Sequence, residues 1–371
     1  MKITELETIF VKPRWLFLKV HTDEGIIGLG EPVVEGRAQT VAAAVKEIGR
    51  YLIGQDPRRI EHHWQAIYRG QFYRGGPVLS SAISGIEQAL WDIMGKWLDV
   101  PVYQLLGGAV RDRIRMYGWL GGETYGDYIE SAKVSAGQGF TALKMGITGA
   151  MNIVDTPAVV EENVKRFAMM REAVGKTVDI GIDFHGRVSP AMAVRLARAL
   201  EPYEPMFIEE PVLPDNVDAM VTVARSTIIP IATGERLFTK WGFREVLEKQ
   251  AATVLQPDLS HAGGILECKK IAAMGETYFA AVAPHCPLGP IALASCLQLD
   301  ACTPNFLAQE HVTLGEGYLK EPFEIKDGYI DLPTKPGLGI ELDEDALADN
   351  LNDGSWETPR LWHADGSVAD W

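Results

Sequence analysis

The sequence VDIGIDF at residues 178–184 is an apolar run of strand length that reaches a carboxylate, Asp183, near its end. Similar runs reach polar residues five more times along the chain. They are MFIE at 206–209, IPIATGE at 229–235, TVLQPD at 253–258, FAAVAPH at 279–285 and FLAQE at 306–310. These polar ends follow one another at intervals of 23 to 27 residues. A strand–helix unit of that length, repeated without interruption, is typical of a (β/α) barrel.

Two further runs precede this repeat and bring the number of candidate strands to eight. The candidate strands are 114–120, 141–145, 178–184, 206–208, 228–232, 253–255, 279–283 and 306–308. Helices at 160–174 and 191–200 fit the outer layer, and residues 146–156 are expected to form an inserted loop. A doubly wound open sheet alternates in the same way. We favour the barrel because polar strand ends recur all the way round, and because the chain beyond residue 112 has the roughly 250 residues that a barrel needs.

The first 112 residues show a different pattern, with strands first and helices afterwards. Apolar runs at 16–21 and 26–30 flank Thr22-Asp23-Glu24-Gly25, which is a hairpin signal. Helical patterns follow at 40–52, 58–68 and 81–97, the last with Ser80 or Ser81 as its cap. The pattern predicts a small α+β domain before the barrel.

Composition limits the classes of partner. The net charge of −15 and the pI near 5.0 disfavour nucleic acid and anionic membranes as partners. No run has the roughly 18 apolar residues of a membrane helix, and Met1–Glu7 resembles no signal peptide. The four cysteines form no CxxC pair, so neither disulfides nor zinc are expected. These features predict a cytoplasmic protein.

Nucleotide-binding motifs are absent from the sequence. Gly28-Leu29-Gly30 follows a hairpin turn and leads into Glu31-Pro32 rather than into a helix, so it fails the structural context of a dinucleotide fingerprint. The chain has no Walker sequence. Its chemistry is therefore expected elsewhere, at the ends of the barrel strands.

Asp183, Glu209 and Glu235 lie at the ends of three successive runs, which in a barrel point into one mouth. Three unpaired carboxylates in an apolar surround would repel one another, and a bound divalent cation resolves that conflict. All-oxygen ligation favours Mg²⁺ over zinc. The alternative is that each acid pairs with a Lys or Arg at the rim. Lys144, at the preceding strand end, is either a substrate or enolate contact or a side chain that reaches solvent.

Two histidines accompany these acids. His185 is two residues after Asp183, hence on the same side of an extended strand, and His285 ends a strand next to the one that ends in Asp258. A carboxylate that accepts the imidazole N–H makes the histidine a better base. Glu310, which ends the last run, is either a group that stabilises developing charge, if it is protonated, or an acid at the rim. The other histidines are interpreted as structural: His21, His62, His63, His261, His311 and His363.

A metal facing a histidine–carboxylate base and a second histidine is typical of proton abstraction next to a carboxylate. The metal would hold the substrate carboxylate and stabilise the enediolate, while the base takes the α-proton. The second histidine is either another base or an acid that helps a β-hydroxyl to leave.

Long motifs carry a resemblance to a known family. They are DFHGR at 183–187, FIEEP at 207–211, GER at 234–236, QPDLSHAGG at 256–264 and PHCPLGP at 284–290, with PRW at 13–15, FYRGG at 72–76 and LWH at 361–363. The chain resembles the enolase superfamily and, within it, the galactonate dehydratase family. The resemblance implies an α/β fold, a (β/α)₇β barrel at 113–340 beneath a capping domain at 1–112. It also implies a homo-oligomer, with residues 341–371 packing back on the capping domain.

The resemblance also implies roles for single residues. Asp183, Glu209 and Glu235 would bind Mg²⁺; His285, oriented by Asp258, would be the base. His185 would be the acid at the departing 3-hydroxyl, and Glu310 a stabiliser. The substrate would be a small sugar acid, D-galactonate first, and the product a 2-keto-3-deoxy acid.

Other functions remain as alternatives. An epimerase or racemase would use the same scaffold, but Lys144-Met145-Gly146 lacks the second lysine of the racemase pattern. Residues 311–315 differ from the galactonate family, which leaves another aldonic acid open as substrate. Arg14 and Tyr73 are candidate substrate contacts, with packing as the alternative for the aromatic ring. Zinc hydrolysis is disfavoured because no His-x-His stands at 119–121. A non-catalytic barrel is the remaining alternative.

Overall fold

The N-terminal part of the chain is an antiparallel sheet covered by helices. The computed structural model describes residues 1–371. Strands β1 (Ile3–Val11), β2 (Trp15–Thr22) and β3 (Ile27–Gly30) form the sheet in that order. Helices α1 (Ala38–Leu52), α2 (Ile60–Arg69) and α3 (Gly76–Leu98) follow. The predicted hairpin and all three predicted helices are confirmed.

The third helix begins earlier than the sequence pattern indicated. It starts at Gly76, after Gly75, rather than at a serine cap. Pro77 fits this first turn because its fixed φ suits a helix start and its missing N–H is not needed there. Ser80 and Ser81 are buried inside the helix instead.

A seven-stranded parallel sheet forms the second part of the molecule, with its strands in sequence order. They are β5 (Gly118–Trp119), β6 (Ala142–Gly146), β7 (Asp179–Asp183), β8 (Ile208–Glu209), β9 (Ile231–Thr233), β10 (Val254–Leu255) and β11 (Ala281–Val282). Every neighbouring pair is parallel. The barrel is therefore confirmed, and the open doubly wound sheet is wrong.

The eighth predicted strand closes the barrel without forming a strand of its own. Residues 306–309 make single parallel bridges, from Phe306 to Val282 at one edge and from Gln309 to Met116 at the other. The first predicted run, 114–120, divides in two. Its start, β4 (Arg113–Arg115), leaves the barrel sheet and pairs antiparallel with β12 (Tyr329–Asp331).

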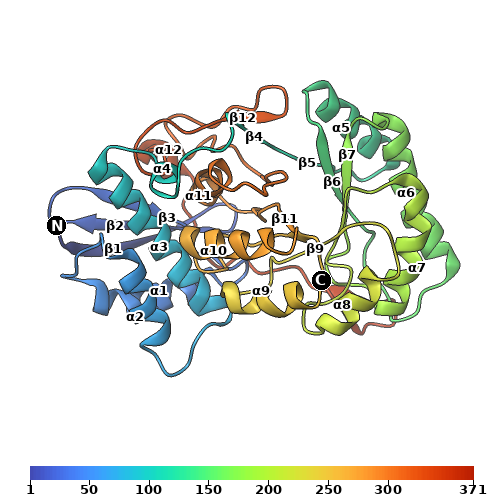
Figure 1. The fold of residues 1–371 in the computed structure, drawn as a ribbon, viewed down its shortest axis with the longest axis horizontal. Helices are drawn as coiled ribbons and strands as arrows, with labels where there is room; N and C mark the ends of the chain where they lie inside the picture. The colour runs from blue at the N-terminus through green and yellow to red at the C-terminus, as the bar shows by residue number, and fades with distance from the viewer.

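Helices surround the sheet, and the C-terminal residues carry three further short elements (Figure 1). The barrel helices are α5 (Tyr125–Gly137), α6 (Pro157–Val174), α7 (Pro190–Leu200), α8 (Val217–Ala224), α9 (Thr239–Glu248), α10 (Ile265–Glu276) and α11 (Pro290–Ala301). The short elements are α4 (Val102–Leu105), the 3₁₀ helix η1 (Glu201–Tyr203), α12 (Glu344–Asp349), β13 (Leu361–Trp362) and β14 (Val368–Ala369). The inserted loop predicted after 146 is confirmed, because β6 ends at Gly146 and α6 begins at Pro157.

Buried carboxylates from the N-terminal part attach it to the barrel. Glu31 accepts hydrogen bonds from the backbone N–H of Gly289 and of Ala292, at 2.6 and 2.9 Å. Glu87, on α3, accepts from the backbone N–H of Ile265 at 2.7 Å. These N–H groups belong to the starts of α11 and α10, where a helix leaves donors unpaired and favours negative charge. The first part of the chain is thereby fixed against the ends of barrel helices.

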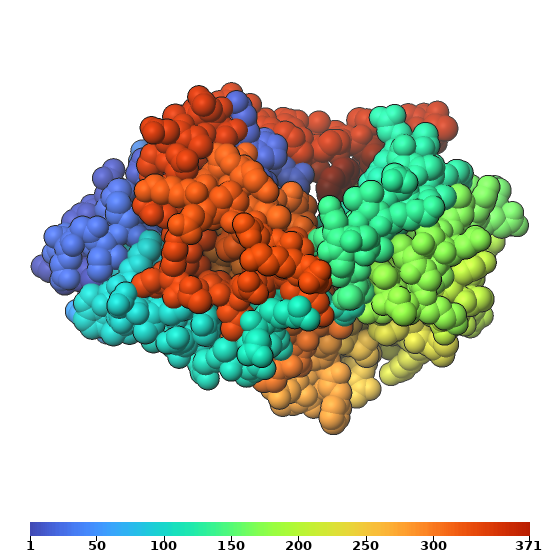
Figure 2. Space-filling model, turned by 90° about the horizontal axis from the view of Figure 1, so that it is seen from above, coloured from blue at the N-terminus to red at the C-terminus, as the bar shows by residue number.

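The C-terminal segment runs back over both parts. Leu351 bridges to Val11 of β1, and the carbonyl of Asp353 accepts a hydrogen bond from Gln39 of α1 at 2.8 Å. Figure 2 shows the dark red end of the chain between the blue N-terminal residues and the green residues of the barrel. The segment therefore spans from the N-terminal sheet to the mouth of the barrel.

Disulfide bonds and membrane-spanning helices were not expected from the sequence. All four cysteines are free and buried: Cys268, Cys286, Cys296 and Cys302. None of the helices combines the length and the apolar composition needed to span a membrane.

Candidate active site

Three carboxylates converge at the mouth of the barrel. Asp183 ends β7, Glu209 ends β8, and Glu235 lies two residues after β9. One oxygen of each lies within 4.8 Å of the others. Three adjacent parallel strands produce this arrangement, because their carboxyl ends share one edge of the sheet. The convergence inferred from the spacing of the runs is what the structure shows.

The surroundings of these carboxylates fit a divalent cation. Oδ2 of Asp183 is buried and has no hydrogen-bond partner. Burial raises the pKa of all three acids, since the charged form loses its hydration. A cation bound by the three oxygens would satisfy the unpaired atom and remove the repulsion between the charges. The cluster is therefore a candidate metal centre.

Lys144 lies beneath this cluster and is fully buried. Its Nζ lies 2.7 and 2.8 Å from the two carboxylate oxygens of Glu209, 3.0 Å from Glu310 Oε1 and 3.6 Å from Asp183 Oδ2. Burial lowers the pKa of Lys144, but the charges of Glu209 and Glu310 outweigh burial and hold it well above its ordinary value. The alternative in which Lys144 reaches solvent is wrong. The alternative in which each acid pairs with a Lys or Arg at the rim is not what the structure shows. Lys144 is buried and pairs with Glu209 and Asp183, and Glu235 has no Lys or Arg partner.

Replacing Lys144 by Met should destabilise the fold, because it leaves buried charges without their partner. Breaking a buried ion pair on one side costs about 3–5 kcal/mol. Urea unfolding of Lys144→Met and of the parent protein, both with a chelator present, measures the difference. Lys320→Met is the control, since Lys320 pairs with Glu341 at the exposed surface and such pairs contribute little. Equal stability of Lys144→Met and the parent would contradict the charge network.

His285 and Asp258 form a direct pair at the opposite side of the cluster. Asp258 Oδ2 lies 2.8 Å from His285 Nδ1, and its Oδ1 accepts the backbone N–H of Ser260 at 2.7 Å. The pair directs Nε2 of His285 toward the three carboxylates, and this nitrogen lies 3.4 Å from Glu235 Oε2. Burial lowers the pKa of His285, but Glu235, Glu310 and Asp258 outweigh it and hold it well above its ordinary value. The geometry suits a histidine base whose orientation a carboxylate fixes. A base must be neutral, and a cation bound by the neighbouring carboxylates would favour that form by offsetting their charge.

His185 also reaches the cluster, although by a different route from the expected one. Strand β7 ends at Asp183, and His185 has a positive φ of 52°, so the extended geometry assumed from the sequence is wrong. The turn is held by Asp183 Oδ1, which accepts the N–H of His185 at 2.7 Å. Nε2 of His185 lies 3.4 Å from Asp183 Oδ2. Burial, with help from Arg187, lowers the pKa of His185 to about 4.

Glu310 is buried among several hydrogen-bond donors. It accepts hydrogen bonds from Trp119 Nε1 at 2.7 Å and from the backbone N–H of Cys286 at 2.8 Å. Burial raises its pKa, but Lys144, His285 and the Cys286 N–H outweigh burial and lower it to about 2. Glu310 is thus ionised, which does not fit the protonated form that its predicted role required. Its oxygens hold Lys144 and the strand end beside His285.

The two residues predicted in the N-terminal part lie in different places. Arg14 lines the cavity above the cluster and donates to the carbonyl oxygen of Pro287 at 3.2 Å. Tyr73 does not line it: its side chain is 83% exposed, because the loop between α2 and α3 carries it to the surface. There its ring lies edge-on to that of Phe72.

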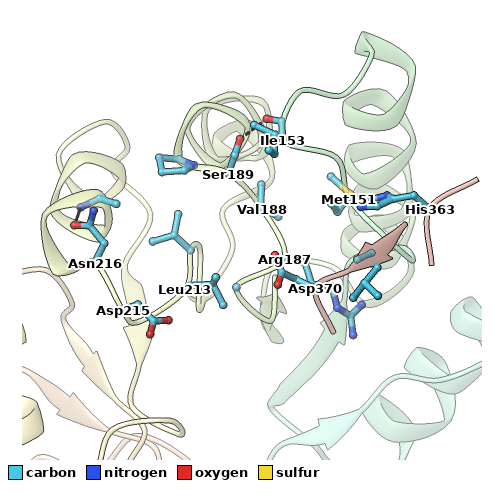
Figure 3. Close-up of a pocket in the computed structure, with 16 residues that line it drawn as sticks. Met151, Ile153, Arg187, Val188, Ser189, Leu213, Asp215, Asn216, His363 and Asp370 are labelled. Carbon is cyan, nitrogen blue, oxygen red and sulfur yellow. Dashed lines mark hydrogen bonds between the residues drawn. The ribbon is translucent and has the colours of Figure 1, made fainter. Parts of the chain in front are cut away.

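The cavity over the cluster has a volume of about 630 Å³. Its lining includes all the predicted site residues apart from Tyr73, Glu209 and Asp258. A neighbouring pocket of about 500 Å³ lies between the loop before α6, the start of α7 and the β13–β14 hairpin (Figure 3). Met151, Arg187 and His363 line that second pocket. It contains no cluster of converging carboxylates, so the chemistry belongs to the first cavity.

Several residues in or beside the cavity were not predicted from the sequence. Glu210 is buried and pairs with Arg236, which also donates to the carbonyl oxygen of His185 at 3.1 Å. The pair braces the turn that carries His185, and the second acid of the motif at 207–211 was the signal for it. Trp371 lines the cavity, with its ring 5.6 Å from that of His185. His261, interpreted as structural, lines the cavity as well.

Two models of known protein families match the chain. The family model described as enolase C-terminal domain-like matches residues 127–346. The model of the mandelate racemase/muconate lactonizing enzyme N-terminal domain matches residues 7–107. The chain belongs to the enolase superfamily, and the resemblance stated from its motifs is confirmed.

Individual proteins similar to the chain give more detail than the family models. Proteins named D-galactonate dehydratase from Ralstonia nicotianae and Cronobacter sakazakii are 53% and 51% identical to the chain, over the full length of both partners. The crystal structure of a mandelate racemase/muconate lactonizing enzyme from Sulfitobacter sp. superposes with a TM-score of 0.93 at 35% identity. That superposition covers 99% of this chain and 100% of the other. The predicted α/β barrel with an N-terminal capping domain is confirmed.

Proposed function

We propose that this protein is a Mg²⁺-dependent sugar-acid dehydratase, a hydro-lyase whose substrate is D-galactonate. One observation carries the proposal: two histidines reach opposite members of a three-carboxylate cluster, His185 beside Asp183 and His285 beside Glu235. Dehydration needs this arrangement, with a base for the α-proton and an acid for the leaving hydroxyl. Full-length identity of 51–53% to D-galactonate dehydratases supports the choice of substrate.

The roles of the residues follow from their contacts. Asp258 accepts a hydrogen bond from His285 Nδ1, which leaves Nε2 as the atom that accepts the α-proton. His185 donates a proton to the 3-hydroxyl as the bond between that oxygen and the third carbon breaks, and water leaves. This role requires the protonated imidazole, so the negative charge of the bound acid must raise the pKa of His185 from the value of about 4 that burial gives it in the free site. The resulting enol tautomerises to a 2-keto-3-deoxy acid. The departing water consists of the 3-hydroxyl and the proton from His185, while the α-proton remains on His285. Exchange of protons with solvent then restores both histidines, so the net change is the loss of one water molecule with no oxidation.

Asp183, Glu209 and Glu235 would hold the cation. Mg²⁺ bound there supplies positive charge that stabilises the developing negative charge on the substrate carboxylate. Lys144 and Arg14 line the cavity, and we propose them as substrate contacts. They would offset the charge that an acid substrate brings into an acidic cavity.

A panel of aldonic acids tests the proposed function. With Mg²⁺ present, D-galactonate should give the highest kcat/KM, measured as the formation of a 2-keto-3-deoxy acid. The panel should include the C4 epimer D-gluconate, since the identity of the sugar acid is the finer part of the proposal. Absence of turnover with every acid would contradict the dehydratase assignment. Exchange of the α-proton without loss of water would favour an epimerase.

Replacing His185 by Asn should separate the two proton transfers. The variant keeps His285 and the carboxylates, so the α-proton should still exchange with deuterated solvent. Dehydration should fall by roughly 10²–10⁴-fold, the effect of losing one general acid. Mass spectrometry of recovered substrate measures exchange, and product formation measures dehydration. An equal loss of both would show that His185 does not act as the acid alone.

The superfamily resemblance also favours a homo-oligomer, and sedimentation velocity of the purified protein tests this. A single species with the mass of one 40.8 kDa chain would contradict it.

A further inference from the structure

His261 is a buried histidine in the cavity whose side chain lacks hydrogen bonds. It follows β10 by six residues and stands in the turn before α10, three residues after Asp258. The residue is only 8% exposed, and its Nε2 is buried with no hydrogen-bond partner. Its Nδ1 lies 3.6 Å from Asp258 Oδ2, beyond hydrogen-bond distance. Buried polar atoms are nearly always paired, so an unpaired one that borders a cavity indicates a missing ligand group.

A carboxylate from the capping part faces the same nitrogen. Glu35, in the loop between β3 and α1, also lines the cavity, and its Oε2 lies 3.7 Å from His261 Nε2. That distance is too long for a direct hydrogen bond. It does allow one hydroxyl oxygen to contact both atoms, accepting the N–H of His261 and donating its own proton to Glu35. A hydroxyl group has both capacities.

The position of Glu35 and His261 indicates which part of a substrate they would contact. The rings of His261 and His285 are 6.5 Å apart, so the pair is removed from the atom that accepts the α-proton. A hydroxyl bound there would belong to a carbon other than the one that loses its proton to His285. We propose that Glu35 and His261 form a subsite for a distal hydroxyl of a polyhydroxy acid. The inference rests on the proposed function and names part of its specificity.

Two other roles for His261 fit the contacts less well. Asp258 already accepts the Nδ1–H of His285 and the N–H of Ser260, so it does not need His261 for its orientation. Asp258, His261 and His285 also form a cluster of possible metal ligands. However, Asp258 and His285 are in direct contact at 2.8 Å, which leaves no room for an ion between those two atoms.

The test compares a long and a short substrate. His261→Leu keeps the side-chain volume but removes both nitrogens. With the sugar acid that the parent enzyme turns over, kcat/KM should fall about 10–100-fold, mainly through a higher KM. With 2,3-dihydroxypropanoate, which has the reacting carbons but no distal hydroxyl, kcat/KM should change less than about threefold. His62→Leu, at an exposed histidine of α2, is the control and should match the parent with both acids.

Glu35→Ala provides an independent check, because it alters the capping part rather than the barrel. It should raise KM for the sugar acid, and the double variant should be little worse than either single variant, since both residues bind one hydroxyl. Each substitution is also combined with His285→Asn, which prevents turnover. Calorimetric titration of the sugar acid into these proteins then measures the dissociation constants for the same comparison. Thermal unfolding shows which variants fold.

Each outcome separates the inference from the proposed function. Turnover of sugar acids by the parent, with an unchanged KM in both Glu35→Ala and His261→Leu, overturns the subsite alone. Equal losses with the long and the short acid, or a lower kcat at unchanged KM, would mean that His261 positions the catalytic pair instead. No turnover of any sugar acid by the parent overturns the proposed function itself, and the subsite with it.

Discussion

Replacing His285 by Asn is expected to abolish both exchange of the α-proton and dehydration, with kcat lowered by roughly 10²–10⁴-fold. His285 is the side chain whose free nitrogen faces the cluster while the other nitrogen is held by Asp258. Asparagine places an amide near the same position but cannot accept a proton at neutral pH. The loss should therefore appear in kcat, while the affinity for substrate changes little.

Two measurements make this prediction specific. Deuterium incorporation at the α-carbon should vanish in His285→Asn yet persist in His185→Asn, because only the first variant lacks the base. Asp258→Asn should reduce activity less than His285→Asn does, since the imidazole remains. Retention of exchange in His285→Asn would contradict the role of His285 as base and would indicate His185 as the base instead.

Replacing Asp183 by Asn is expected to have a comparably large effect. The change removes one of three oxygen charges that would bind the cation, and losing such an electrostatic contact costs roughly 10²–10³-fold in kcat. Calorimetric titration with Mg²⁺ should show weaker binding than in the parent, independently of any turnover. The control is Asp179→Asn, at the exposed start of the same strand, where the carboxylate pairs with Arg115. Equal Mg²⁺ affinity in the Asp183 and Asp179 variants would exclude Asp183 as a ligand.

The features that repeat along the chain could be predicted from the sequence. The period of apolar runs placed Asp183, Glu209 and Glu235 on three adjacent strand ends, because a parallel barrel brings every carboxyl end to one side. The neighbouring runs placed Asp258 beside His285 by the same reasoning. Strand neighbours are set by chain order, so these contacts need no knowledge of side-chain packing.

Features that depend on irregular backbone could not be predicted in the same way. His185 reaches its place through a left-handed turn, and the assumption of an extended strand gave the right neighbour for the wrong reason. Tyr73 was assigned from its motif, but the loop that carries it points away from the cavity. No local pattern in the sequence reports the direction of such a loop.

Contacts between distant parts of the chain were the hardest to foresee. Lys144 is buried among the carboxylates of Asp183, Glu209 and Glu310, which come from three other parts of the chain, and a single strand end gives no sign of that. His261 looked like an ordinary structural histidine until Glu35, 226 residues earlier, was found opposite its unpaired nitrogen. Trp371 enters the cavity only because the C-terminal segment crosses from the N-terminal sheet to the barrel mouth.

Crystals grown with Mn²⁺ in place of Mg²⁺ test the central claim, that three carboxylates hold one cation. Anomalous scattering locates manganese without assumptions about the protein. The account predicts a single strong peak bounded by oxygens of Asp183, Glu209 and Glu235, and no such peak in crystals of Asp183→Asn. A peak elsewhere in the molecule, with Lys144 still bridging Glu209 and Glu310, would contradict it.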